Sequence, residues 1–200
     1  HYGALQGKDK AETLTWSDLH GRVTQAANLF RSLGIGEKDV VAYLLPNSVE
    51  TAIVLLGGAV AGIVNPINPL LEAEQIAAIL RETNAKVLVT LKAFPKTDVP
   101  QKAAEALKHA PNVKVVLEVD LNRYLTPPKS WIVPLVRPKF EVHHKARIGS
   151  FRAEAAKMPA DRLTARGSAW RSALVRRSPG ASVAAAQAGV DVVARRLATT

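Results

Sequence analysis

The stretch "LPNSVETAIVLLGGAVAGIVNPINPLL", from Leu45 to Leu71, decides how the surrounding chain folds. Its glycine-rich part, "GGAVAG" (Gly57–Gly62), looks at first like a loop that binds phosphate. Such a loop places its glycines between a strand and the N-terminus of a helix, where backbone N–H groups converge on the anion. Here the glycines come at the end of a predicted helix and before a predicted strand, and no Lys-Ser or Lys-Thr pair follows them. We therefore interpret them as positions where the helix packs closely against a neighbour.

The residues on both sides of this stretch alternate between helix and strand patterns. Apolar residues at helical spacing predict a helix that ends near Leu33, before Gly34. Its start follows a short β-type segment, Thr13–Trp16, and its cap is either Ser17 or Thr15 paired with Asp18. Four buried strands are predicted from short apolar runs that turn residues interrupt: Asp39–Pro46, Gly62–Pro66, Ala85–Thr90 and Asn112–Asp120.

Three more helices are predicted between these strands. Asn47 or Ser48 caps the first, which runs to about Ala61. The second carries Glu72 and Glu74 in its first turn and closes at Asn84, and the third begins with Asp98 as its cap and Pro100 just inside. These elements predict an α/β fold in which alternating strands and helices form a partial parallel sheet.

The alternation of predicted strands and helices, and the place where it stops, divide the chain into three parts. Residues 13–120 form the α/β part, residues 121–161 a proline-rich connector with room for one short helix, and residues 162–200 a tail rich in Arg and Ala. The tail has no lysine and no apolar stripe with a polar face, so we expect it to be poorly ordered. The change of composition occurs near Leu163.

The net charge of +10 comes from the last two-fifths of the chain alone. Residues 1–120 hold 12 Lys and Arg against 13 Asp and Glu, whereas residues 121–200 hold 15 against 4. The aromatic residues do not alternate with the basic ones, which disfavours a nucleic-acid surface. The absence of cysteine excludes disulfides and thiolate metal sites. No apolar run reaches the roughly 18–20 residues of a membrane span, and we expect a cytoplasmic protein.

No residue is assigned a catalytic, cofactor-binding or metal-binding role. "GIG" (Gly34–Gly36) is interpreted as a helix stop and a turn, and the adjacent His143 and His144 as a solvated pair that diverges too far to share a metal. Asp18 and Glu50 lie early in predicted helices, where they complement the helix dipole. No "GxSxG" elbow frames a serine. "VRRSPG" in the tail looks like a kinase target, but so short a pattern arises by chance.

Several of these pieces together resemble the N-terminal region of the adenylate-forming, AMP-binding enzymes, which include the acyl-CoA synthetases. "LTWSDL" (Leu14–Leu19) is similar to that family's first core motif. "DVVAYLLPNSVE" (Asp39–Glu50) resembles its strand and turn, and "GGAVAGIVNPINPLLEAEQIAAIL" (Gly57–Leu80) its second core motif. "AKVLVT" (Ala85–Thr90) fits the next strand. The segment "NPINPLLEAEQI" resembles bacterial acyl-CoA synthetases in particular.

The resemblance implies an ATP-dependent ligase that converts a carboxylic acid to an acyl-adenylate and transfers the acyl group to CoA. It implies ATP, Mg2+ and CoA as partners of the parent enzyme. It also implies a Ser/Thr/Gly-rich loop that ends in Pro-Lys, an acidic residue for the ribose and a mobile C-terminal domain with a lysine. No "TSGTTGxPK"-like string occurs in the 200 residues. The expectation is an N-terminal fragment that is inactive as given and holds no cofactor.

The tail suggests a hypothesis: residues after about Leu163 are a shifted-frame translation of GC-rich DNA. Two alternatives stay open. The chain is either a small non-enzymatic α/β interaction module whose basic tail binds an anionic partner such as nucleic acid, or a degenerate product without a function. Salt-dependent nucleic-acid binding that requires residues 162–200 would favour the interaction module.

Overall fold

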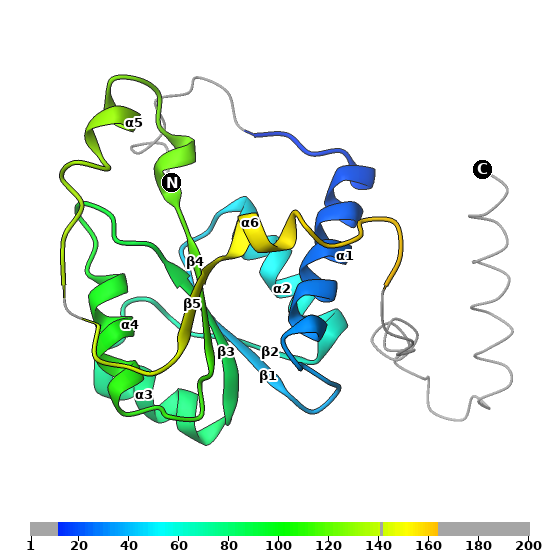
Figure 1. The fold of residues 1–200 in the computed structure, drawn as a ribbon, viewed down its shortest axis with the longest axis horizontal. Coiled ribbons are helices and arrows are strands. Elements are labelled where there is room, and N and C mark those ends of the chain that lie inside the picture. Colours follow the sequence, from blue (N-terminus) through cyan, green and yellow to red (C-terminus); the bar gives the residue numbers. More distant parts are fainter. Residues whose placement is uncertain (1–11, 141, 164–200) are drawn as a thin grey trace, which may run out of the picture. The chain divides into compact units, whose positions relative to one another are not determined.

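The described part of the chain forms a parallel sheet of five strands with helices on both faces (Figure 1). The computed structural model describes residues 12–140 and 142–163. In the order β2-β1-β3-β4-β5, every neighbouring pair of strands is parallel. The strands are β1 (Val40–Leu44), β2 (Ile63–Pro66), β3 (Ala85–Leu91), β4 (Val115–Val119) and β5 (Arg147–Ser150). The predicted α/β class and the four predicted strands are confirmed, but the expected burial of the second strand is wrong, because β2 lies at the edge of the sheet and none of its residues is buried.

The strand order reverses once along the chain. From β1 the chain steps outward to β2 and then crosses back over β1 to β3, so that Val41 lies between Val64 and Val87. In open α/β sheets, ligands bind beyond the carboxyl ends of the strands near such a reversal. The reversal therefore marks the end of the sheet where functional groups are sought.

Helices pack against the two faces of the sheet (Figure 1). On one face lie α1 (Trp16–Ser32), α2 (Val49–Ala61) and the short α6 (Phe151–Ala155), and on the other lie α3 (Ala73–Glu82) and α4 (Val99–Lys108). The segment between β4 and β5 contains the 3-10 turn η2 (Leu121–Tyr124) and the single turn α5 (Lys129–Ile132). Both faces of the central strands are thus covered, which explains their near-continuous apolar sequence.

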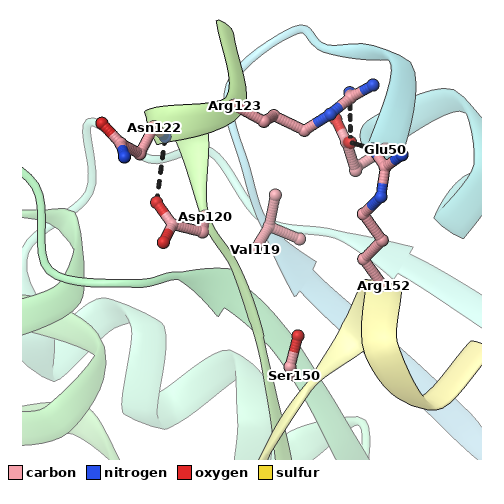
Figure 2. Close-up of a pocket in the computed structure, with 7 residues that line it drawn as sticks. All are labelled: Glu50, Val119, Asp120, Asn122, Arg123, Ser150 and Arg152. Atoms are coloured by element: carbon pink, nitrogen blue, oxygen red, sulfur yellow. Dashed lines mark hydrogen bonds and ion pairs between the residues drawn. The ribbon is translucent and has the colours of Figure 1, made fainter. Parts of the chain in front are cut away.

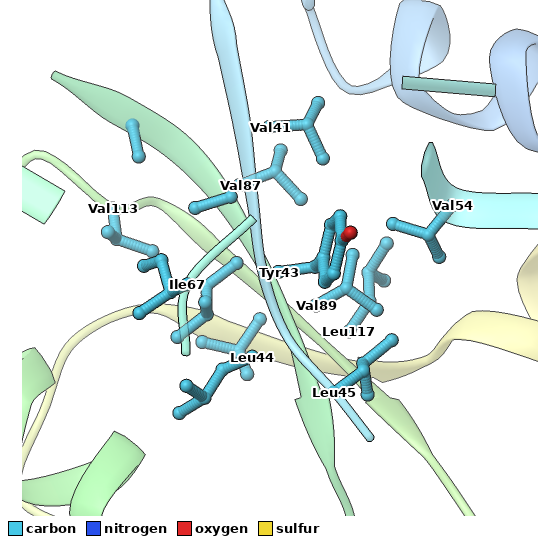
Figure 3. Packing of buried hydrophobic residues seen from close by; sticks show 14 of the residues in the cluster. Val41, Tyr43, Leu44, Leu45, Val54, Ile67, Val87, Val89, Val113 and Leu117 are labelled. Atoms are coloured by element: carbon cyan, nitrogen blue, oxygen red, sulfur yellow. The ribbon is translucent and has the colours of Figure 1, made fainter. Parts of the chain in front are cut away.

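The core is built from aliphatic side chains of the central strands and their flanking helices (Figure 3). All five residues of β1 are buried, and Leu88 and Leu117 of the next two strands are completely buried. Phe151 of α6 stacks on Phe30 of α1 with ring centroids 6.1 Å apart. The sheet and α1 are therefore joined through residues 151–155, beyond the last strand.

The N-terminus of α1 settles the choice between two predicted caps. Thr15 and Asp18 form a reciprocal capping box, in which the Asp18 backbone N–H donates to the Thr15 hydroxyl at 3.1 Å. Ser17 lies inside the helix, so its prediction as the cap is wrong, as is the β-type start at 13–16. Both hydroxyl residues could accept a bond, but only Thr15 has a carboxylate three residues later to return it.

The other predicted helix ends are mostly confirmed. Ser48 caps α2, with its hydroxyl accepting from the Thr51 backbone N–H at 3.2 Å. Asn84 ends α3 with a φ of 49°, in the left-handed region. Asp98 stands at the N-cap of α4 but makes no capping bond, because its carboxylate pairs with Lys102 at 3.2 Å instead.

The connector predicted for residues 121–161 contributes more to the fold than expected. It supplies β5 and α6, and its last residues lie along α1. Asn28 donates to the carbonyls of Pro159 and Arg162, both at 2.9 Å, and Gln25 donates to the carbonyl of Met158 at 3.1 Å. The predicted disorder and the shifted-frame hypothesis concern residues that, after Leu163, lie outside the described part of the chain.

Candidate functional site

A pocket of about 200 Å3 opens at the carboxyl end of the sheet (Figure 2). It lies where β4 and β5 end and where α2 begins, because parallel strands bring their carboxyl ends to one edge. Three charged side chains, from α2, η2 and α6, meet there. The residues that line it are Glu50, Val119, Asp120, Asn122, Arg123, Ser150 and Arg152.

Glu50 is the centre of an ion-pair cluster in this pocket. Its side chain is buried, with 4% of its surface exposed. One carboxylate oxygen accepts from Arg123 at 2.6 Å and the other from the Tyr124 hydroxyl at 2.5 Å. Arg152 approaches the first oxygen to 3.9 Å, and Arg123 also binds Glu12 at 2.9 Å. The cluster therefore ties the start of α2 to η2 and to the segment before α1.

These contacts change the acidity of two groups. Burial and then the hydrogen bond to Glu50 raise the pKa of Tyr124 far above its usual value, so its hydroxyl keeps its proton and donates. Burial acts to raise the pKa of Glu12, but Arg123 and Arg22 hold it below its usual value. The Glu12 carboxylate is thus kept charged by the two guanidinium groups that it contacts.

A second ion pair involves Asp120, another residue that lines the pocket. Arg137 donates to the Asp120 carboxylate at 2.6 Å and to the carbonyl of Ala93 at 2.9 Å. Asp120 also accepts from the Asn122 backbone N–H at 2.9 Å and so caps η2 (Figure 2). Ser150, at the end of β5, accepts from the Ala153 backbone N–H and caps α6. These polar groups fix the turns that follow the strands.

The arrangement is that of a structural polar cluster. Both oxygens of Glu50 accept from donors that hold them, and a carboxylate in that state is a poor general base. Within residues 12–140 and 142–163 there is no group of three His, Asp or Glu side chains that could hold a metal ion. The pocket could still take a small anion beside Arg152, whose side chain is 61% exposed.

The glycine-rich stretch of α2 lies away from this pocket, at the far end of that helix. A Cβ at Gly57 would lie 2.7 Å from the Ala26 Cβ of α1, and one at Gly58 would lie 3.1 Å from Val64. At Gly62 it would lie 2.5 Å from the carbonyl oxygen of Gly36. The structure confirms that these glycines permit close packing between α2, α1 and the strands.

The turn predicted at "GIG" is confirmed, whereas the prediction that His143 and His144 are a solvated pair is wrong for His144, whose Nδ1 is buried. Gly34 ends α1 with a φ of 84°, and the Gly36 N–H donates to Asp39 at 2.9 Å, which makes "GIG" a helix stop and a turn. Burial lowers the pKa of the half-buried His144, which favours its neutral form. "VRRSPG" lies outside the described residues. Among the residues described, no helix is both long and apolar enough to cross a membrane.

Sequence reasoning missed the partners of Glu50. It placed Glu50 in the first turn of a helix, which is confirmed, and explained it by the helix dipole alone. Arg123 and Tyr124 lie more than 70 residues further along the chain. Only one weak signal was present: a glutamate next to buried positions of α2 needs a compensating cation, and the connector is rich in arginine.

The profile of one protein family matches most of the chain. The family is described as "AMP-binding enzyme", and its profile matches residues 2–150. The chain belongs to the AMP-binding enzyme family. The resemblance drawn from the core motifs is therefore confirmed, for the N-terminal region of that family.

Named relatives agree with this assignment. The chain is 44% identical over 84 residues to marinolic acid–CoA ligase of a Pseudoalteromonas species, covering 42% of this chain and 13% of that protein. It is 36% identical over 119 residues to acetyl-coenzyme A synthetase of Sodalis glossinidius, covering 57% and 18%. A benzoate CoA ligase structure from Burkholderia xenovorans shares the fold, with a TM-score of 0.55 at 17% identity, over 83% of this chain and 29% of that one. The chain therefore spans less than a third of the length of these proteins.

Proposed function

We propose that this chain is the N-terminal scaffold of an ATP-dependent acyl-CoA ligase. The parent enzyme would activate a carboxylic acid as its acyl-adenylate and transfer the acyl group to CoA. The observation that carries the proposal is the family match over residues 2–150. The five-stranded parallel sheet and the names of the relatives support it.

The 200-residue chain by itself is proposed not to catalyse adenylation. The triphosphate of ATP needs converging backbone N–H groups, a lysine and Mg2+ to neutralise its charge. Neither the glycines of α2 nor the Glu50 cluster offers such a cradle, because the first are packed between elements and the second is filled by its own ion pairs. ATP, Mg2+ and CoA are proposed as ligands of the parent enzyme rather than of this scaffold.

The proposal is tested by assaying carboxylate-dependent release of pyrophosphate from ATP. The purified 200-residue chain is expected to show no release above a no-enzyme blank with acetate, benzoate or a long-chain fatty acid, whereas a full-length acyl-CoA ligase serves as the positive control. Sustained release that requires the carboxylate would refute the proposed inactivity.

The coding DNA tests the shifted-frame hypothesis separately. Translation in the other two frames after the codon for Leu163 is expected to reveal a Ser/Thr/Gly-rich loop that ends in Pro-Lys. A protein restored to that frame is then expected to release pyrophosphate with one of these acids. If neither frame encodes such a loop, the hypothesis fails and a truncated or divergent tail is preferred.

The interaction-module alternative predicts a different result from the same preparation. Its basic tail would bind nucleic acid with an affinity that falls steeply with salt. Loss of that binding when residues 162–200 are removed would favour the interaction module over the scaffold.

A further inference from the structure

The segment between η2 and β5 carries an exposed apolar surface. Residues 129–136 form consecutive helical turns, in which Val133 donates to the carbonyl of Lys129 and Val136 to that of Val133. Four side chains of these turns face solvent, with exposed fractions of 70%, 49%, 84% and 55%: Trp131, Ile132, Leu135 and Val136. We call these four residues the apolar tip.

The apolar tip is held firmly at both ends. On one side the Asn122 side chain donates to the carbonyl of Ser130 at 3.0 Å. On the other side Arg137 is fixed by Asp120 and by the carbonyl of Ala93. Val133, which is 9% exposed, anchors the middle of the segment. The fold therefore presents these side chains outward instead of letting them collapse onto the core.

The sequence around the tip carries charges of one sign, although Arg123 and Arg137 are paired with Glu50 and Asp120. Residues 121–140 contain four Lys and Arg and no Asp or Glu. Lys129 and Lys139, on either side of the tip, are exposed. Tryptophan favours the boundary between lipid headgroups and acyl chains, and flanking lysines are attracted to anionic headgroups. A bilayer also accepts such a tip without the shaped groove that a protein partner must offer.

We propose that the apolar tip docks on an anionic lipid surface. The indole of Trp131 and the side chains of Leu135 and Val136 enter the headgroup region, while Lys129 and Lys139 pair with lipid phosphates. Four side chains bury little apolar area, so attachment is reversible and depends on both components. This inference is independent of the proposed ligase function, because it rests on the surface alone.

Quenching of Trp131 fluorescence by brominated lipid tests the docking. The 200-residue chain is prepared with Trp16→Phe and Trp170→Phe, which leaves Trp131 as the only indole in its sequence. Vesicles contain phosphatidylcholine brominated on the acyl chains, with about a third phosphatidylglycerol. Saturable quenching is expected, and raising the salt concentration is expected to weaken it because the lysine contacts are screened.

Variants of the tip distinguish vesicle binding by the tip from vesicle binding by the basic tail, because every variant keeps the tail. The double variant Leu135→Ser/Val136→Ser, which keeps the probe, is expected to need at least about tenfold more lipid for half-maximal quenching. Leu70→Ser removes an apolar side chain that is 82% exposed at another site, and it is expected to change nothing. Because all three side chains are exposed, unchanged unfolding midpoints check that the variants fold.

Three results would overturn the proposal. Vesicles that pellet the chain while Trp131 remains unquenched would show attachment through other basic residues. An equal effect of Leu70→Ser would show that any exposed leucine matters. Concentration-dependent self-association that the double variant abolishes, without lipid binding, would identify a second copy of the chain as the occupant of the tip.

Discussion

The close approach of α2 to α1 at Gly57 leads to a sharp stability prediction. A Cβ at Gly57 would lie 2.7 Å from the Ala26 Cβ and 3.2 Å from the backbone nitrogen of Ala27. Carbon atoms pack best at about 3.5–4.0 Å, so the substitution Gly57→Ala must push the two helices apart. Gly21, in the interior of α1, offers the matched control, because its Cβ would meet Ala160 at an ordinary 3.7 Å.

The magnitude follows from two opposing effects. Replacement of glycine by alanine inside a helix stabilises by roughly 0.5–1 kcal/mol because the unfolded chain loses freedom. Overpacking a tight core costs about 1–3 kcal/mol. Gly21→Ala should therefore raise the free energy of unfolding by about 0.5–1 kcal/mol, and Gly57→Ala should fall below it by about 1–3 kcal/mol.

Urea unfolding of the full-length chain, followed by far-ultraviolet circular dichroism, measures both variants against the parent. The midpoint and slope together separate a loss of stability from a change in the unfolded state. If Gly57→Ala stabilises the protein as much as Gly21→Ala does, the helices do not pack closely through this glycine. The packing interpretation of the stretch would then be refuted.

Three further predictions follow from the polar groups. Glu50→Gln removes the buried charge that pairs with the half-buried Arg123 and should lower the free energy of unfolding by about 1–3 kcal/mol, whereas Glu74→Gln, at an exposed position, should not; equal urea midpoints would contradict the cluster. Burial raises the pKa of Glu118, so its contribution to stability is full below its usual pKa and is lost as pH rises through the raised value. Glu118→Gln should therefore leave the urea midpoint unchanged at about pH 4 and raise it at about pH 7, and a stabilisation of the same size at both would count against this reasoning. Asn28→Ala removes the donors that hold the carbonyls of Pro159 and Arg162, so trypsin should cleave within 157–162 faster while the sheet stays intact, and unchanged cleavage would argue against that attachment.

The central strands could be predicted because both of their faces are buried. A strand between two helical layers must be apolar at nearly every position, and "VVAYL" in β1 satisfies that requirement without any knowledge of its neighbours. The edge strand β5 could not be recognised in this way. Its sequence "RIGS" is mostly exposed and, among the strands described, pairs only with β4, so it needs no apolar pattern.

The polar cluster around Glu50 could not be predicted either, because its contacts join residues that are far apart in the sequence. The capping box of Thr15 and Asp18 is local, and its spacing could be read directly. The pairing of Glu50 with Arg123 is made by the fold, which brings α2 and η2 to the same end of the sheet. No periodicity encodes a contact across 73 residues. The same applies to Asn28 and the carbonyls of residues 159 and 162.

The most direct test asks whether this chain is a scaffold without a nucleotide site. The 15N-labelled 200-residue chain is titrated with Mg-ATP, and the amide chemical shifts are followed. We expect no saturable shift at Gly57, Gly58 or Gly62, because these backbones are packed against α1, β2 and the turn before β1. We expect the same for the amides around Glu50. Saturable shifts centred on the glycines of α2 would show that this stretch binds phosphate and would contradict its role as scaffold.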